Sequence, residues 1–244
     1  MGLMKGFVCA AVATLGWGLL TATTVMCEGR QAEIPLMTQD VRAVHLRDVG
    51  ANRLYALHFP AALEDLNLSV NGLMLLPEGF VPANVKRLWL ADNRLMALPK
   101  EVAANKALIY LNLDRNRFTE LPDLSQTALR WVRLNGNQLK RVPALPDSVE
   151  RLYLAGNQLR AFHQKPKALR QLKLANNPIE SIDPQLGCGL EELDLSGTRL
   201  THLPEALEGW QSLRVLNLAR CSLDAAEKDR IEAAFDPLKT LVIF

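Results

Sequence analysis

The stretch VKRLWLADNRL, residues 85–95, carries the pattern that decides the fold. Leu88 and Leu90 alternate with residues of other kinds, so a short strand at this point has one apolar face. Asn93 follows where the strand must turn, and Leu95 returns the chain to the apolar side. The segment therefore predicts a strand and a turn whose apolar face cannot be buried by this segment alone.

The same pattern, LxxLxLxxNxL, recurs along the chain with starts 20 to 23 residues apart. The other copies begin at Leu63, Leu108, Leu129, Val149, Leu169, Leu190 and Leu213, and a degenerate copy begins at Val41. Stacked copies would place their strands side by side, which predicts a parallel sheet above a continuous leucine core. The 46 Leu among 244 residues supply the apolar area for such a core.

This repeat resembles the leucine-rich repeat family, over about 200 residues. The resemblance implies an α/β solenoid: a right-handed superhelix with a parallel concave β-sheet. Apolar-Pro steps such as Leu76-Pro77 follow the strands. Because Pro lacks a backbone donor, we expect the convex segments to be extended or short helices. The short copies are similar to those of bacterial secreted leucine-rich repeat proteins, which favours a bacterial source.

One slot at the turn holds Asn in most copies. An amide side chain at this slot can bond backbone groups of its own turn and of the adjacent copy, so we predict a structural Asn ladder. Its members are Asn71, Asn93, Asn116, Asn137, Asn157 and Asn177. Thr198 and Cys221 occupy the slot in the last two copies, and we interpret Cys221 as structural.

The first residues have the form of an export signal. Lys5 is followed by 20 uncharged residues from Phe7 to Met26, and we expect residues 1–27 to be a signal peptide. Three alternatives stay open: an uncleaved membrane anchor, lipidation at Cys27, and a buried segment that caps the fold.

The rest of the chain is expected to form one repeat domain. Residues 28–40 are a lead-in, 41–223 the repeats, about nine in number, and 224–244 a C-terminal cap helix and strand. Asp224 and Glu227 have the spacing of a capping box, so the cap helix should begin there and end near Phe235.

Composition argues against several kinds of function. With 28 basic and 26 acidic residues the chain is nearly neutral, which disfavours nucleic acid as a partner. The four cysteines match no disulfide framework or zinc spacing, and no cofactor or metal is expected. The four histidines belong to separate copies, and neither a phosphate loop nor a nucleophile elbow is present, so we predict that the chain is not an enzyme.

The strand residues that flank the second strand leucine, or the residue in its place, form two columns on the predicted concave face, with successive strands about 4.8 Å apart. Between Arg87 and Lys173 these columns hold rings and cations, which are enriched at binding hot spots. The predicted ligand-binding residues are Arg87, Trp89, Tyr110, Trp131, Arg133, Arg151, Tyr153 and Lys173.

A simpler interpretation of this face also stays open. Arg151 could stack on Trp131 and Arg133 on Tyr153 as ordinary cation–ring pairs. Lys173 could likewise pair with Asp194 as an exposed ion pair.

The hypothesis from sequence is a noncatalytic exported module that recognises a protein ligand through its concave face. A cell-envelope glycan-binding protein is one alternative, because exposed rings also stack on sugars. A bacterial effector that binds a host protein is another. The protein would be secreted or held in the cell envelope, in the periplasm or at the surface. Membrane contact is expected only through an uncleaved N-terminal segment.

Overall fold

The computed structural model of the chain describes residues 10–13 and 22–244. Residues 1–9 and 14–21, which make up most of the predicted signal peptide, lie outside the described residues. The chain divides into two compact units. Unit 1 comprises Met1–Arg117 with Gln126–Ala128, and unit 2 comprises Phe118–Ser125 with Leu129–Phe244.

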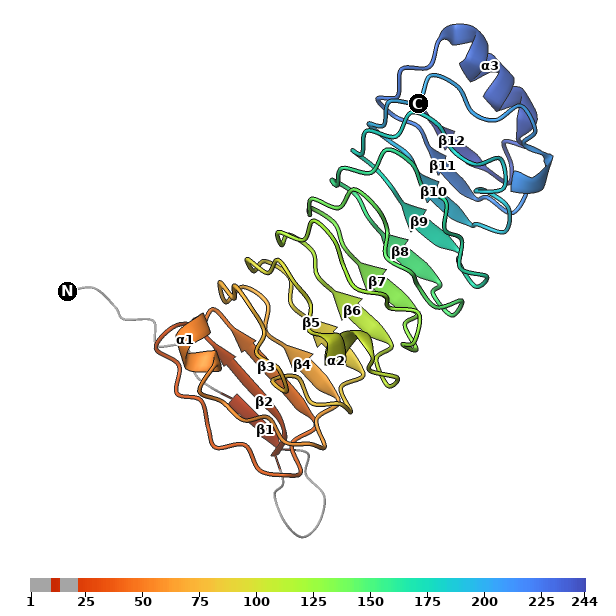
Figure 1. The fold of residues 1–244 in the computed structure, drawn as a ribbon. Helices are drawn as coiled ribbons and strands as arrows, with labels where there is room; N and C mark the ends of the chain where they lie inside the picture. Colours follow the sequence, from red (N-terminus) through yellow and green to blue (C-terminus); the bar gives the residue numbers. More distant parts are fainter. Residues whose placement is uncertain (1–9, 14–21) are drawn as a thin grey trace. The chain divides into compact units, whose positions relative to one another are not determined.

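Unit 1 is built on strands that follow one another in sequence order (Figure 1). They are β1 (Ala10–Ala13), β2 (Ala22–Glu28), β3 (Ala43–Arg47), β4 (Asp65–Asn67), β5 (Arg87–Trp89) and β6 (Tyr110–Asn112). β1 runs antiparallel to β2, and the strands from β2 to β6 are parallel. Leu88 pairs with Leu66 on one side and Leu111 on the other, so the apolar positions are in register.

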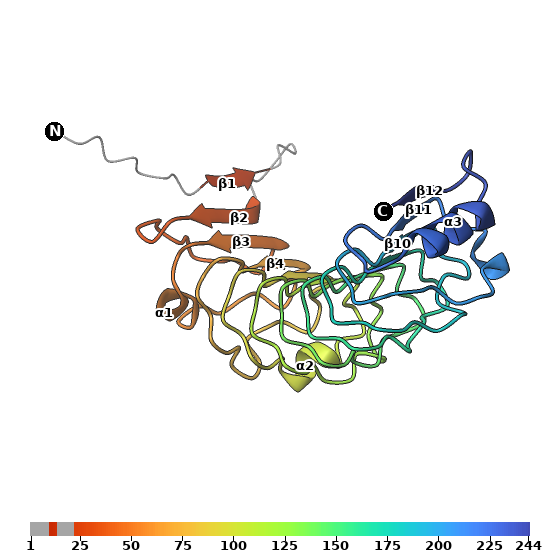
Figure 2. The ribbon, with the colours of Figure 1, turned by 90° about the horizontal axis from the view of Figure 1, so that it is seen from above.

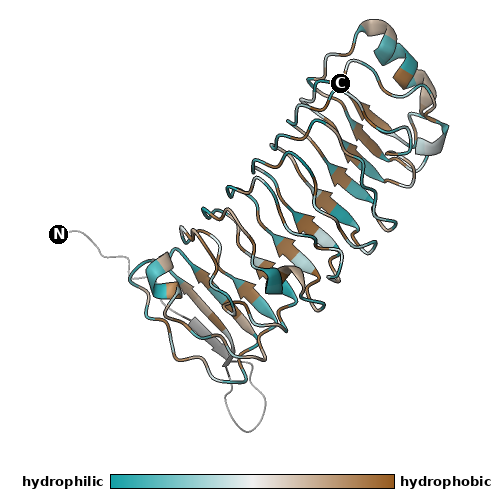
Figure 3. Cartoon of the chain, in the orientation of Figure 1, coloured by the Kyte–Doolittle hydropathy of each residue, from teal (hydrophilic) through white to brown (hydrophobic). Residues whose placement is uncertain are grey.

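Unit 2 repeats the same parallel arrangement. Its strands are β7 (Trp131–Arg133), β8 (Arg151–Tyr153), β9 (Gln171–Lys173), β10 (Glu192–Asp194), β11 (Val215–Asn217) and β12 (Leu241–Ile243). Each of these strands from β7 to β11 has a buried middle residue between two residues that are partly or fully exposed. Apolar and hydrophilic residues accordingly alternate along the strands in Figure 3. Both units are therefore parallel-strand solenoids, as the leucine pattern predicted.

The core of each coil consists of the strand leucines and the apolar residue after the turn. Leu88, Leu90 and Leu95 have no exposed surface. Complete burial of such a side chain contributes about 1.5–3 kcal/mol relative to exposure. Stability is thus spread along the stack in small, repeated contributions.

The turns that follow the strands from β3 to β11 share one backbone geometry. The residue just before the ladder slot lies in the left-handed region, with φ between 49° and 66°. These residues are Asp48, Val70, Asp92, Arg115, Gly136, Gly156, Asn176, Gly197 and Arg220. A left-handed residue reverses the chain sharply enough for the next side chain to enter the core.

The Asn side chains at the ladder slot are buried and bond backbone groups of two coils. The Asn93 Oδ1 accepts hydrogen bonds from the N–H groups of Asn71, at 3.1 Å, and Leu73, at 3.0 Å. Its Nδ2 donates to Leu68 O and Leu90 O at 3.0 and 2.9 Å. Asn157 makes the corresponding bonds within unit 2.

The outer segments are mostly extended, and the helices are short. They are α1 (Ala51–Leu54), α2 (Lys100–Ala103), the 3-10 helix η1 (Glu208–Trp210) and α3 (Ala225–Ala234). α1 and α2 lie on the side of the coils away from the strands of unit 1 (Figure 2). Pro steps and short coils leave no room for longer helices there.

The α3 helix begins as the capping-box spacing predicted. The Asp224 Oδ1 accepts a hydrogen bond from the Glu227 N–H at 2.8 Å. The Glu227 carboxylate, however, accepts from the Leu203 N–H at 2.7 Å and pairs with Arg230. It does not complete the box, and instead it ties α3 to the preceding coil.

Part of the predicted signal peptide takes part in the unit 1 sheet. β2 pairs with β3 in parallel register, with Val25 opposite Val44 and Cys27 opposite Leu46. Val25 and Cys27 are 2% and 3% exposed. Cys27 is in a disulfide bond, which the sequence analysis did not predict. Among the described residues, no helix is long and apolar enough to cross a membrane.

Candidate functional site

In the strands from β3 to β11, the first and third residues project from the sheet on the side opposite the leucine core. We call this surface the open face; it corresponds to the face that the sequence analysis expects to be concave. The predicted ligand-binding residues all lie on it, and they divide between the two units. Arg87, Trp89 and Tyr110 belong to unit 1, and Trp131, Arg133, Arg151, Tyr153 and Lys173 belong to unit 2.

In unit 1 the open face carries a row of three rings. The Trp89 ring lies 5.0 Å from the Tyr110 ring and 5.9 Å from the His45 ring, measured between centroids. His45 is not among the predicted ligand-binding residues, although it occupies the same column as Trp89 in the degenerate first copy. Aligning that copy with the others would have found it.

Arg87 is paired with a carboxylate of the neighbouring strand, and its side chain stays 52% exposed. Its Nε donates to Asp65 Oδ1 at 2.6 Å, and its Nη2 donates to the second carboxylate oxygen. These hydrogen bonds raise the pKa of Arg87. Asp65 and Arg87 are adjacent entries of one column, so the pairing could have been predicted from the strand register.

His45 is half-buried beside this ion pair. Its burial lowers the pKa of the imidazole below its ordinary value; the Asp65 carboxylate opposes this shift and Arg87 adds to it. His45 therefore tends to be neutral at neutral pH, and it extends the ring row as an uncharged side chain.

In unit 2 the rings and cations contact one another. The Arg151 guanidinium lies 4.9 Å from the centroid of the Trp131 ring. Arg133 and Lys173 lie 5.5 and 5.6 Å from the centroid of the Tyr153 ring. The two rings meet edge to face at 6.0 Å. The simpler cation–ring pairings considered from the sequence are thus present in the structure.

A short chain of polar contacts holds Tyr153 in place. Its hydroxyl donates to Gln171 Oε1 at 3.1 Å, and Gln171 Nε2 donates to Glu192 Oε1 at 3.3 Å. Lys173 Nζ lies 3.9 Å from Glu192 Oε2. The lysine therefore pairs with Glu192 and not with Asp194, which lies directly opposite it on β10. Glu192 belongs to the other column and reaches Lys173 diagonally.

The unit 2 cluster, which consists of Trp131, Arg133, Arg151, Tyr153 and Lys173, is partly exposed. Trp131, Tyr153 and Lys173 are half-buried, and Arg151 is exposed. Among the described residues, no carboxylate forms an ion pair with Arg151. The described part of the chain also has no group of three or more His, Cys, Asp or Glu residues able to hold a metal ion. The cluster thus offers fixed ring edges and exposed positive charge.

Comparison with known proteins identifies the repeat. A sequence model of the family described as leucine rich repeat matches residues 167–223. YopM, a leucine-rich effector protein from Yersinia pestis, superimposes with a TM-score of 0.62 at 24% identity, covering 79% of this chain and 52% of that one. The leucine-rich repeat domain of a Shigella effector superimposes with a TM-score of 0.58 at 23% identity, covering 66% of this chain and 70% of that one. The chain is a leucine-rich repeat protein.

Curated relatives share the repeat over part of their length. Lumican from Coturnix japonica is 31% identical over 126 residues, which is 47% of this leucine-rich repeat protein and 36% of lumican. Podocan-like protein 1 from Mus musculus is 34% identical over 198 residues, which is 74% of this chain and 34% of the relative. The chain spans about a third of the length of these relatives. The two effector structures are only 23% and 24% identical to this chain, so they establish the fold alone.

Proposed function

We propose that this leucine-rich repeat protein is a noncatalytic, exported module that binds a protein ligand through its open face. The observation that carries the proposal is the unit 2 cluster, where Trp131 and Tyr153 are held in fixed contact with cations and yet stay partly exposed. Side chains that are already ordered lose little conformational entropy on binding. Trp, Tyr and Arg are also the residue types that dominate protein interfaces.

The exposed charge of Arg151 favours an acidic group on the ligand. Arg133, Arg151 and Lys173 lie on three consecutive strands of unit 2. A carboxylate placed against Arg151 would gain a charge-assisted hydrogen bond without displacing a partner within the described chain. Such contacts contribute more to the specificity and the association rate of a complex than to its affinity.

A glycan ligand is less well supported by the same geometry. Sugars bind protein rings by stacking on a free ring face. Arg151 lies over the Trp131 ring, and Arg133 and Lys173 lie over the Tyr153 ring, so these faces are already in use. A glycan array screened with the full chain tests this alternative, and specific binding there would replace the protein-ligand proposal.

The decisive experiment compares variants of the open face. The full chain serves as bait in a crosslinking pull-down, and the purified partner is then titrated by calorimetry. We expect Trp131→Ala combined with Arg151→Ala to weaken affinity at least tenfold, and Trp89→Ala to report whether unit 1 contributes. Arg160→Ala, on an outer segment of unit 2, is the matched control. Unchanged affinity in all open-face variants would reject this surface.

Export is the second part of the proposal, and it is supported by the apolar N-terminal segment. Removal of residues 1–27 would also remove all of β2 except Glu28 and leave the β3 edge unpaired. Sequencing the N-terminus of the protein recovered from cell envelope and medium distinguishes a cleaved signal from a retained segment. An intact N-terminus in a protein that is found inside a host cell would support the effector alternative instead.

A further inference from the structure

The outer segments, which lead from the turn after one strand to the next strand, have an unusual composition at one place in unit 1. The two positions that follow the core residue after each turn hold at least one charged or polar side chain in the coils of unit 2. These pairs are Thr119-Glu120, Lys140-Arg141, Arg160-Ala161, Glu180-Ser181 and Thr201-His202. In two consecutive coils of unit 1 they are Met74-Leu75 and Met96-Ala97.

The apolar side chains at these positions are turned to solvent. Met74, Leu75 and Met96 are 57%, 56% and 59% exposed. The core does not need them, because Leu76 and Leu98 fill it from the same segments and are almost fully buried. Contiguous apolar surface of this kind marks interaction sites on soluble proteins, and the flexible Met side chain adapts to varied ligand shapes.

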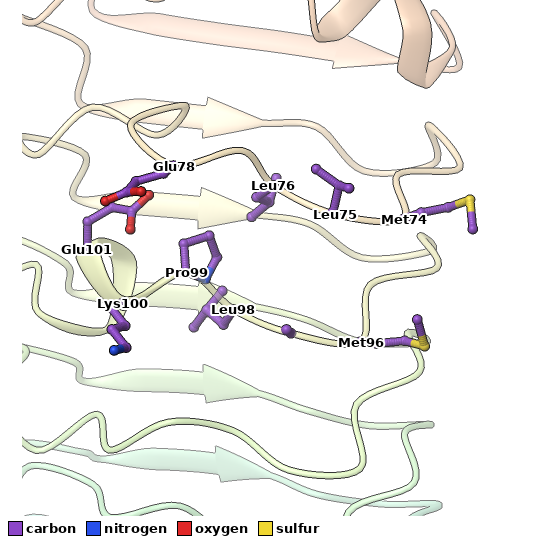
Figure 4. Close-up of a pocket in the computed structure, with 10 residues that line it drawn as sticks. Met74, Leu75, Leu76, Glu78, Met96, Leu98, Pro99, Lys100 and Glu101 are labelled. Carbon is purple, nitrogen blue, oxygen red and sulfur yellow. The ribbon is translucent and has the colours of Figure 1, made fainter.

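These residues help to line a groove of about 680 Å³ between the two outer segments. In Figure 4 Met74 and Met96 lie at one end and the Glu78 and Glu101 side chains at the other. The Gly79 N–H donates to Glu101 Oε1 at 2.9 Å, which holds this carboxylate beside residue 78. Lys100 extends away from the two carboxylates in the same view.

The two ends of the groove differ in chemistry, and this difference identifies the occupant. Within the described chain neither Glu78 nor Glu101 has a cationic partner, so their charges are complementary to a basic group from elsewhere. Residues 74 and 78 are separated by about 13 Å if the segment is fully extended. The apolar surface continues beyond Glu78 to a ring cluster in which Phe80 lies 5.3 Å from Phe59 and 6.2 Å from Tyr55.

We propose that this groove binds a segment of a partner protein that carries a large apolar side chain and, about four extended residues away, a Lys or Arg. The apolar side chain lies between Met74 and Met96, and the basic group pairs with Glu78 and Glu101. The site is on the outer side of unit 1 and does not depend on ligand binding at the open face.

The test is a selection from a random peptide display library on the immobilised full chain. Met74→Thr combined with Met96→Thr is the counter-selection target, because Thr occupies the same slot at residues 119 and 201. We expect enriched peptides to carry an apolar residue with a Lys or Arg three to five positions away. An enriched peptide, measured by fluorescence anisotropy, should bind at least tenfold more weakly to the Met variant and at least threefold more weakly to Glu78→Gln with Glu101→Gln.

Controls separate this site from general effects. Arg160→Thr changes the same slot in unit 2 and should leave peptide affinity unchanged. Circular dichroism and the unfolding midpoint should be unaltered in all variants, because the altered side chains are at least partly exposed. The proposal is overturned if no peptide is enriched over the Met variant, or if enriched peptides are acidic. It is also overturned if the Met variant abolishes self-association in analytical ultracentrifugation or binding to phosphatidylcholine vesicles, which would assign the groove to a second copy or to lipid.

Discussion

The Asn93 amide serves two coils at once, and its loss should be costly. In Asn93→Ala the N–H groups of Asn71 and Leu73 lose their acceptor inside the core. Asn93 Nδ2 also contacts three carbonyls, and each of them keeps another donor: Leu68 O from Asn71, Leu90 O from Asn116, and Ala91 O from the Val70 N–H. At about 1–3 kcal/mol for each unsatisfied buried group, we expect the free energy of unfolding to fall by about 2–5 kcal/mol in urea titrations.

Asn84→Ala is the matched control for this prediction. Asn84 makes one exposed hydrogen bond, from its Nδ2 to Ala61 O at 2.9 Å. Its removal should cost less than about 1 kcal/mol. Equal losses in the two variants would mean that the ladder is not a special contributor to stability.

Val70 is the one β-branched residue among the left-handed turn positions of the described chain, with φ at 63°. The left-handed conformation costs an L-residue about 1–2 kcal/mol, and Asn adopts it more readily. Val70→Asn should therefore raise the free energy of unfolding by about 1 kcal/mol, while the bond from Val70 N to Ala91 O is retained. The same substitution at Val81, which does not have a positive φ, should destabilise the protein; a destabilised Val70→Asn would show that side-chain packing outweighs backbone strain.

At the level of elements, the attachment of α3 depends on an ionised Glu227. Hydrogen bonds from Arg230 and Leu203 lower the pKa of this carboxyl below its ordinary value. A lowered native pKa means that the stabilisation is complete above the pKa of the unfolded state, about 4.3, and is lost as pH falls through the native pKa. Glu227→Gln should cost about 1–2 kcal/mol at pH 7, and this difference from wild type should shrink on acidification.

Unfolding by urea between pH 7 and pH 3 measures this effect. Glu180→Gln is the control, because Glu180 and Arg199 are 3.5 Å apart and both 67% exposed. Its effect should be small and nearly independent of pH. A Glu227 variant whose deficit persists at pH 3 would show that packing of α3, and not the charge, is responsible.

The elements also show where sequence reasoning succeeds and where it stops. The strands follow from a period-two pattern repeated at fixed spacing, so they were predictable. The partner of Lys173 was not, because the choice between Glu192 and Asp194 depends on side-chain reach across strands. Trp210 is fully buried, and its indole N–H donates to Pro184 O at 2.8 Å. The indole packs so closely against Gly187 that a Cβ added to this glycine would lie only 2.1 Å from the ring. No local pattern encodes such a fit.

The N-terminal segment shows the same limit for a whole element. An apolar run of this length satisfies the requirements of an export signal and of a core strand equally well. In the folded chain β2 is a core strand, because its register on β3 places Val25 and Cys27 in the core. The sequence pattern alone does not contain this register. The ring row and the cation cluster of the open face, by contrast, were predictable as columns. The pairing of Arg87 with Asp65 was predictable as well, because the two residues are adjacent entries of one column.

At the scale of the whole molecule, the repeat makes stability a sum of contacts between adjacent coils. A defect should therefore loosen its neighbours more than distant coils of the same unit. In Asn177→Ala the Leu159 N–H loses its acceptor, and the coil carbonyls of Leu154 and Leu174 lose a donor. Hydrogen exchange measured by mass spectrometry should then accelerate in peptides covering 154–180, by about tenfold for each 1.4 kcal/mol of local destabilisation.

Peptides that cover β11 and β12 provide the internal comparison, because they lie at least two strands beyond β9 in unit 2. Their exchange rates should change far less if coupling is limited to nearest neighbours. Arg199→Ala, which removes only an exposed ion pair, should leave both regions unaltered. A uniform acceleration from β7 to β12 would instead show that unit 2 opens as one cooperative block, and stability would then have to be assigned to the unit rather than to its coils.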